Sequence, residues 1–159
     1  MIYWFFGFPG IGKDYCAKRL AVIEKFSYLD ADDFLTDEDR EKLLNKKFTR
    51  QDRLLKLERI IDHIKKLQKH HDNIALGDSL PDNTSREYVL SAFSGQIKLI
   101  LVTAPSIVHK KRISQRKNHF FGENLLDDYM KKWEEVSVSH IAFENNSSRN
   151  LDERLKELR

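Results

Sequence analysis

Residues 7–13 carry the feature that most limits how this chain folds. They read Gly-Phe-Pro-Gly-Ile-Gly-Lys, after an apolar run at 2–6 and before a helical pattern at 14–25. A buried strand, a glycine loop ending in lysine, and a helix, in that order, are typical of a phosphate-binding loop. Glycines let successive backbone N–H groups turn toward phosphate oxygens, and the next helix adds its N-terminal N–H groups and positive dipole end.

This loop predicts a nucleotide site. Lys13 is expected to act in catalysis by reaching the terminal phosphates as a point charge. We expect ATP as the nucleotide, with Mg²⁺ beside it. The residues expected to bind the nucleotide are Gly7, Pro9, Gly10, Ile11, Gly12, Lys13, Asp14 and Tyr15.

Asp14 departs from the usual pattern, in which Ser or Thr follows the lysine and its hydroxyl meets Mg²⁺. A carboxylate is itself a good ligand for Mg²⁺. It also places a negative charge near the phosphates, where repulsion at ~5 Å and an effective dielectric of ~20 is on the order of 3 kcal/mol. Three interpretations stay open: Asp14 binds the metal, it weakens ATP binding, or it points away and serves the helix start.

Apolar runs and helical patterns alternate along the rest of the chain. Strands are expected at 2–6, 26–29, 73–77, 97–103 and 140–143, and helices at 14–25, 37–45, 50–70, 84–93, 106–117, 124–136 and 151–158. This alternation predicts an α/β fold with a parallel sheet covered on both faces. Ligands of such folds bind beyond the carboxyl ends of the strands.

Composition narrows the class of protein. With 159 residues, 40% hydrophobic and 33% charged, the chain is expected to form one globular domain over 1–159. No apolar run approaches the ~20 residues that span a bilayer, so no membrane partner is expected. Cys16 is the single cysteine, which favours a reducing, cytoplasmic location. The net charge of +3 is too small to favour a nucleic-acid partner.

Acidic residues follow two of the expected strands. Asp30, Asp32 and Asp33 come after the second strand, and Asp78 ends the third. Asp32 is expected to hold or deprotonate the hydroxyl that accepts the phosphoryl group. Asp33 is interpreted as a helix cap, and Asp78 as a residue that binds substrate or organises Mg²⁺. The residues that these patterns predict to organise the metal are Asp14 and Asp78, and Asp30 joins them only through the resemblance described below.

Basic residues gather later in the chain. Arg112 and Arg116 lie four residues apart, on one helix face, and suit the clamping of a transferring phosphoryl group. A loop near 117–125, which contains Gly122, is expected to close over the site as a lid. Arg86, downstream of Asp78, is expected to reach the substrate.

Several of these segments together resemble the small P-loop kinases of the gluconate kinase and shikimate kinase type, within the nucleoside monophosphate kinase fold. The phosphate loop matches, and residues 28–33, Tyr-Leu-Asp-Ala-Asp-Asp, resemble the "LDGDD" strand end of gluconate kinases. Arg112 and Arg116, with His119-Phe120-Phe121 and Leu125-Leu126 after them, are similar to the lid pattern "RxxxRxxHF…LL".

The resemblance implies a three-layer αβα P-loop fold with five parallel strands in the order 2-3-1-4-5. It implies that Arg112 and Arg116 contact ATP phosphates, that Asp32 contacts a sugar-like substrate, and that Asp30 meets the metal through water. His119 belongs to the lid pattern and is expected near the substrate. Residues 77–80, Gly-Asp-Ser-Leu, depart from the "CSAL" segment of gluconate kinases, so gluconate itself is not implied.

The sequence thus predicts an enzyme that transfers phosphoryl from ATP to a hydroxyl of a small metabolite, as a monomer or dimer. The alternatives are a nucleoside or nucleotide kinase, which uses the same fold with another acceptor pocket, and a degenerate, non-catalytic ATP-binding module. GTPases are excluded because neither a D-x-x-G nor an N-K-x-D string occurs. The role of Asp14 decides between these alternatives, because a metal-binding Asp14 keeps catalysis and one that repels phosphate does not.

Overall fold

The sheet contains five parallel strands in the order β2-β3-β1-β4-β5. The computed structural model describes residues 1–106, 108–109, 112, 123–146 and 150–159. Its strands are β1 (Ile2–Phe6), β2 (Ser27–Asp30), β3 (Ile74–Gly77), β4 (Ile97–Thr103) and β5 (Ile141–Glu144). The predicted strand order and parallel sheet are confirmed.

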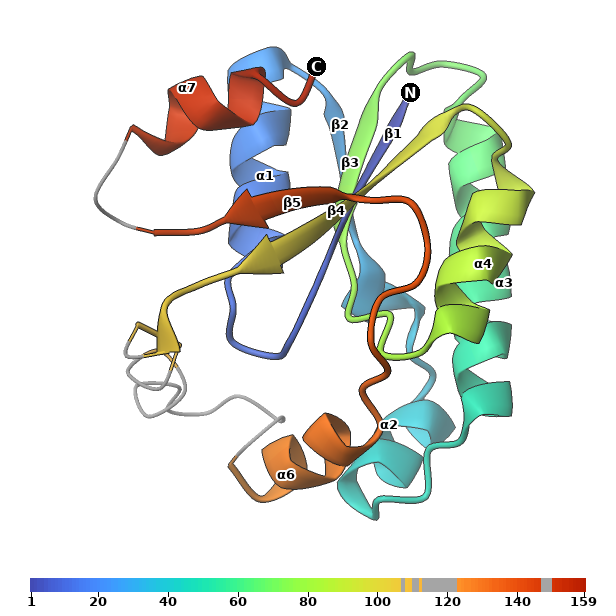
Figure 1. The fold of residues 1–159 in the computed structure, drawn as a ribbon. Coiled ribbons are helices and arrows are strands. Elements are labelled where there is room, and N and C mark those ends of the chain that lie inside the picture. The colour runs from blue at the N-terminus through green and yellow to red at the C-terminus, as the bar shows by residue number, and fades with distance from the viewer. Residues whose placement is uncertain (107, 110–111, 113–122, 147–149) are drawn as a thin grey trace.

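Helices cover both faces of this sheet, as Figure 1 shows: α1 and α7 lie on one side and α3 and α4 on the other. The helices are α1 (Lys13–Glu24), α2 (Asp37–Leu44), α3 (Arg50–Leu67), α4 (Asn83–Ala92), α6 (Glu123–Lys131) and α7 (Leu151–Lys156), with a short 3₁₀ turn η1 (Ala31–Phe34) after β2. No described helix is long and apolar enough to cross a membrane.

The central strand β1 explains the two cores, because alternate side chains of a strand point to opposite faces. Ile2, Trp4 and Phe6 pack with apolar residues of α3 and α4. Tyr3 and Phe5 pack with those of α1 and α7. All five residues are buried, as expected for a strand at the centre of a three-layer fold.

The two helices that follow the second strand begin at capping boxes. Thr36 caps α2 and shares reciprocal hydrogen bonds with Asp39, and Thr49 caps α3 in the same way with Asp52. Side-chain bonds from Lys42 and Thr49 lower the pKa of Asp52 to about 2. Asp33 was expected to act as a helix cap, but Thr36 caps α2 and Asp30 caps η1.

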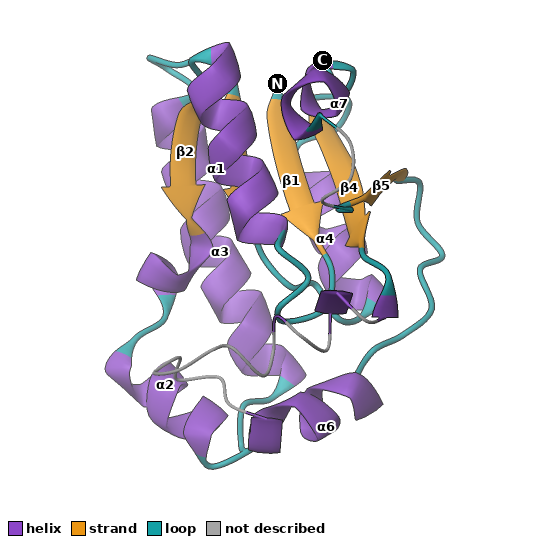
Figure 2. Cartoon of the chain, turned by 90° about the vertical axis from the view of Figure 1, so that its left-hand side faces the viewer, coloured by secondary structure: helices purple, strands orange, loops and turns teal. Residues whose placement is uncertain are grey.

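The carboxyl ends of the strands point toward the side of the molecule where α2 and α6 lie, as Figure 2 shows. The glycine loop follows β1 at this edge, and the acids after β2 and β3 follow at the same edge. The topology therefore brings the predicted site segments together.

Candidate active site

The glycine loop at 7–13 has backbone angles that favour glycine at three positions. Gly7, Gly10 and Gly12 all have positive φ angles, of 152°, 80° and 93°. A Cβ on Gly7 would lie 2.7 Å from the carbonyl oxygen of Val102, so only glycine fits there. Gly12 is followed at once by α1, which places the N-terminus of that helix beside the loop.

Side chains from the β4–β5 side hold the loop in place. His109 Nε2 donates to the carbonyl of Pro9 at 2.8 Å. Arg112 Nη1 and Asn145 Nδ2 both donate to the carbonyl of Ile11, at 2.8 and 3.0 Å. A loop held in this way loses little freedom when a ligand binds. Arg112, predicted to act on phosphates, therefore lies against the phosphate loop.

Lys13 and Asp14 begin α1 at the edge of a cavity. Lys13 is 8% exposed, and its Nζ lies 3.2 Å from Asp14 Oδ2. Both residues line the cavity, so the interpretation in which Asp14 points away from the site is wrong. Metal binding by Asp14 and repulsion of phosphate stay open predictions. Tyr15 is 61% exposed and is not found among the described residues that line the cavity.

The cavity extends from the loop to a second wall formed by α2, α3 and α6. Its apolar lining is Pro9, Leu35, Leu43, Phe48, Leu80 and Tyr129. Its charged lining is Lys13, Asp14, Asp32, Lys46, Arg53, Lys56, Asp78, Asp128 and Lys132. A space with an apolar part and several polar groups suits a small polar ligand.

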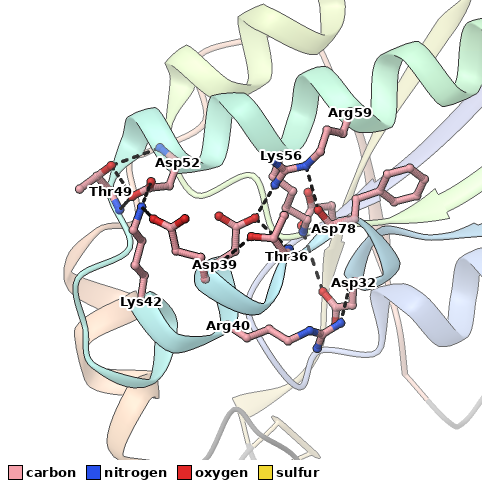
Figure 3. Close-up of polar contacts among 12 residues, drawn as sticks. Asp32, Thr36, Asp39, Arg40, Lys42, Thr49, Asp52, Lys56, Arg59 and Asp78 are labelled. Carbon is pink, nitrogen blue, oxygen red and sulfur yellow. Dashed lines mark hydrogen bonds and ion pairs between the residues drawn. The ribbon is translucent and has the colours of Figure 1, made fainter.

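Lys56 bridges two of the predicted acids. It is buried on α3, and its Nζ lies 3.1 Å from Asp78 Oδ1 and 3.8 Å from Asp32 Oδ1. Figure 3 shows Lys56 on α3 with Asp78 and Asp32 beside it. The backbone N–H of Ser79 also donates to Asp78 Oδ1, at 2.7 Å. The cation thus holds the Asp78 carboxylate by a hydrogen bond and attracts the more exposed Asp32 carboxylate across 3.8 Å.

The two carboxyl groups respond differently to this setting. Burial alone would raise the pKa of Asp78, but Lys56 and the Ser79 N–H outweigh it and lower that pKa below its ordinary value. Burial raises the pKa of Asp32, which Lys56 offsets only in part, and the nearby charge of Asp78 adds to the rise. Asp32 is therefore the more basic of the two.

Asp30 does not have the setting predicted for it. Its carboxylate accepts a hydrogen bond from the backbone N–H of Asp32 at 3.0 Å and so caps η1. It is exposed and is not among the described residues that line the cavity. The described residues contain no group of three side chains spaced to hold a metal. Contacts to a metal through water need no such group, so the metal roles expected of Asp14, Asp30 and Asp78 stay predictions.

Arg86 does not face the cavity. It is 0% exposed, and its guanidinium donates to the carbonyls of Leu80, Pro81 and Glu134, each at 3.0 Å. It also bonds to Asn83 Oδ1 at 2.8 Å. The structure therefore does not place Arg86 for the substrate contact predicted from the sequence, because its donors already join the β3–α4 turn to the segment after α6.

Three other predictions lie outside the described residues. These are Arg116, His119 and most of the lid segment 117–125, of which only the last three residues belong to α6.

The cavity also contains residues that the sequence did not indicate. Arg53 lines it beside Lys56, and its Nη1 lies 2.8 Å from Asp82 Oδ2, the carboxylate that caps α4. Tyr129, buried, and Lys132 come from α6 and the residue after it. One signal was present: Arg53 and Lys56 lie three residues apart beside the apolar stripe of α3, so they share its buried side.

Several solved structures that are similar to this chain are kinases of small molecules. A sugar kinase from Janibacter sp. HTCC2649 matches with a TM-score of 0.80 and 18% identity, over 99% of this chain and 91% of that one. A gluconokinase from Sinorhizobium meliloti 1021 has a TM-score of 0.76 and 19% identity, over 98% and 87%. The APS kinase CysC of Mycobacterium tuberculosis, solved with AMPPNP and APS, has a TM-score of 0.68 and 16% identity, over 99% and 94%.

This chain has the fold of a P-loop kinase. The similarity covers nearly all of its length, and the sheet order is the one predicted. No family model matches the chain, and no curated protein is similar to it in sequence. At these identities the similarity establishes the fold, and the chemistry rests on the residues of the site.

Proposed function

We propose that this protein transfers the terminal phosphoryl group of ATP to a hydroxyl of a small metabolite. One observation carries the proposal: a phosphate loop with three glycines at positive φ opens onto a cavity that also holds Asp32, Lys56 and Asp78. A nucleotide site and a polar acceptor site thus share one space.

On the nucleotide side, the backbone N–H groups of the loop and of the first turn of α1 bind the phosphates. Lys13 neutralises charge on the terminal phosphates. The ion pair between Lys13 and Asp14 breaks when phosphate binds, because a polyphosphate carries more negative charge than a single carboxylate. Arg112, already against the loop, adds positive charge.

Mg²⁺ fits the site through Asp14. Carboxylate oxygens are suitable ligands, and this metal usually needs only one or two of them besides water and phosphate oxygens. Asp14 lines the cavity next to Lys13, whereas Lys56 already occupies Asp78. The metal would supply charge neutralisation between the phosphates.

On the acceptor side, Asp32 binds the hydroxyl that receives the phosphoryl group and takes up its proton. Asp32 lines the cavity near Lys56, and the direction in which its pKa is shifted, above the ordinary value, favours uptake of that proton. Lys56 and Asp78 bind neighbouring polar groups of the acceptor as donor and acceptor of hydrogen bonds. A loose phosphoryl-transfer transition state needs mainly such positioning and charge stabilisation.

The test is acceptor-dependent release of ADP from ATP with Mg²⁺, screened over sugar acids, polyols and nucleosides. We expect one of these classes to stimulate turnover, and Asp32→Asn to lower kcat by about 100-fold. Asp33→Asn, a matched change at the exposed neighbouring residue, should leave kcat within twofold. Stimulation by nucleosides alone would support a nucleoside kinase instead.

A degenerate ATP-binding module is the second candidate, because the ion pair between Lys13 and Asp14 competes with phosphate. It predicts that ATP binds without any acceptor-stimulated turnover. Asp14→Ser, which restores the hydroxyl at the end of the loop, would then strengthen ATP binding.

A further inference from the structure

Trp133, two residues beyond the end of α6, packs against the phosphate loop. Its ring centroid lies 4.2 Å from that of Phe8, with the two planes inclined by 35°. Phe8 stands inside the loop, between Gly7 and Pro9. On another side, the Phe8 ring stacks near His109 at 6.3 Å, the residue that also bonds to the Pro9 carbonyl.

The indole is itself held on a rigid base. The guanidinium of Arg86 lies 4.8 Å from the Trp133 ring, within the range of a cation–π contact. Arg86 is fixed by carbonyls of the β3–α4 turn and of Glu134. The N–H of Glu134 bonds back to the carbonyl of Pro81 at 2.8 Å. Trp133 therefore has little freedom to move away from Phe8.

The same segment forms one wall of the cavity. Asp128, Tyr129 and Lys132 line it, and Trp133 follows directly. Figure 2 places α6 beyond the carboxyl ends of the strands. Residues 128–133 thus contact both parts of the site: Asp128, Tyr129 and Lys132 line the acceptor cavity, and Trp133 packs against the phosphate loop.

We propose that Trp133 is a positioning residue, which holds the phosphate loop in its binding conformation through Phe8 and ties that loop to the acceptor wall. The proposal rests on the proposed function for the identity of the ligand. Loss of an aromatic stacking partner frees the Phe8 part of the loop, and the nucleotide must then order it on binding.

The experiment measures binding of AMPPNP with Mg²⁺ by calorimetry and, in parallel, the emission of the protein's tryptophans. Trp133→Ala should raise the Kd of AMPPNP about tenfold, whereas Trp133→Phe, which keeps an aromatic ring against Phe8, should stay within about threefold. Met130→Ala, an exposed position on α6, is the matched control and should leave the Kd unchanged. AMPPNP should also change the tryptophan emission of the wild-type protein but not of Trp133→Phe, since Trp4 is fully buried in the core.

The outcomes separate this inference from the proposed function. If AMPPNP binds and phosphoryl transfer occurs, but Trp133→Ala binds as tightly as the wild-type protein, the inference is wrong and the function stands. An equal loss of affinity in Trp133→Ala and Trp133→Phe also overturns it, as does the same emission change in the wild-type protein and in Trp133→Phe. If the wild-type protein binds no AMPPNP, both proposals fall.

Discussion

Lys56 and Arg86 are both buried cations, yet they do different things. Lys56 faces the cavity and holds two carboxylates there, whereas Arg86 lies among backbone carbonyls behind it. A buried charge that loses its partner is costly, so changes at both residues should be visible in stability. Their effects on ligand binding should differ.

Replacement of Lys56 by methionine should lower the free energy of unfolding by about 3–5 kcal/mol, because Asp78 is left buried without its cation. The double change Lys56→Met with Asp78→Asn removes both charges and should recover part of this loss. Chemical denaturation measures both values. Lys66→Met, at an exposed position of the same helix, is the control.

The same pair predicts a pH dependence. Since the pKa of Asp78 is lower in the folded state, the unfolded chain binds the proton more readily. Its stabilisation is therefore complete above the ordinary aspartate pKa of ~3.9 and is lost as the pH falls through the folded value. The double variant should show a smaller loss of stability on acidification, and equal slopes would contradict the assignment.

For Arg86, the buried network predicts a structural effect. Arg86→Lys should lower the free energy of unfolding by about 2–4 kcal/mol, because an ammonium cannot reach all of the acceptors that the guanidinium now serves. Thermal unfolding measures this change. If Arg86→Lys were as stable as the wild-type protein but had a raised KM for the acceptor, the substrate contact predicted from the sequence would be supported instead.

At the scale of elements, the site depends on how closely α1 approaches β3. A Cβ on Gly77 would lie 3.0 Å from the Cα and 3.1 Å from the N of Asp14, and it would also meet the Asp14 carboxylate. The first turn of α1 therefore packs directly on the end of β3, which fixes Asp14 and Lys13 relative to Asp78.

Gly77→Ala tests this contact. The added methyl group should push the first turn of α1 outward, lowering the free energy of unfolding by about 1–3 kcal/mol. The same displacement should weaken AMPPNP binding, measured by calorimetry, by roughly tenfold. The control is Gly95→Ala, whose Cβ would meet nothing within 4 Å. The positive φ at position 95 should lower the free energy of unfolding of this variant by about 1 kcal/mol. Its affinity for AMPPNP should not change. Equal affinities for both variants would contradict the role given to this contact.

At the scale of the whole molecule, the sequence predicted the sheet and the position of the phosphate loop. Each strand is a short apolar run that ends at a glycine, an acid or a turn, and such local signals can be read from the sequence alone. The loop was equally clear, because residues other than glycine rarely adopt positive φ angles such as those of Gly10 and Gly12.

The contacts between distant segments could not be predicted in this way. Arg86 was assigned to substrate because nothing near it in sequence indicates that its guanidinium meets the carbonyl of Glu134, 48 residues away. Lys56 was missed because it stands beside the apolar stripe of α3, where periodicity indicates only burial. The capping bond of Asp30 could not be read from the sequence either, because a capping carboxylate and a ligating one look alike in a string of acids.

The most direct test of the account is a calorimetric titration with AMPPNP, first with Mg²⁺ and then with EDTA, on the wild-type protein and on Lys13→Met. Lys66→Met again serves as the control for loss of a lysine. We predict micromolar binding that needs Mg²⁺, is lost in Lys13→Met and is kept in Lys66→Met. Absence of binding in both conditions, or equal binding by Lys13→Met, would contradict the claim that this loop is a working nucleotide site.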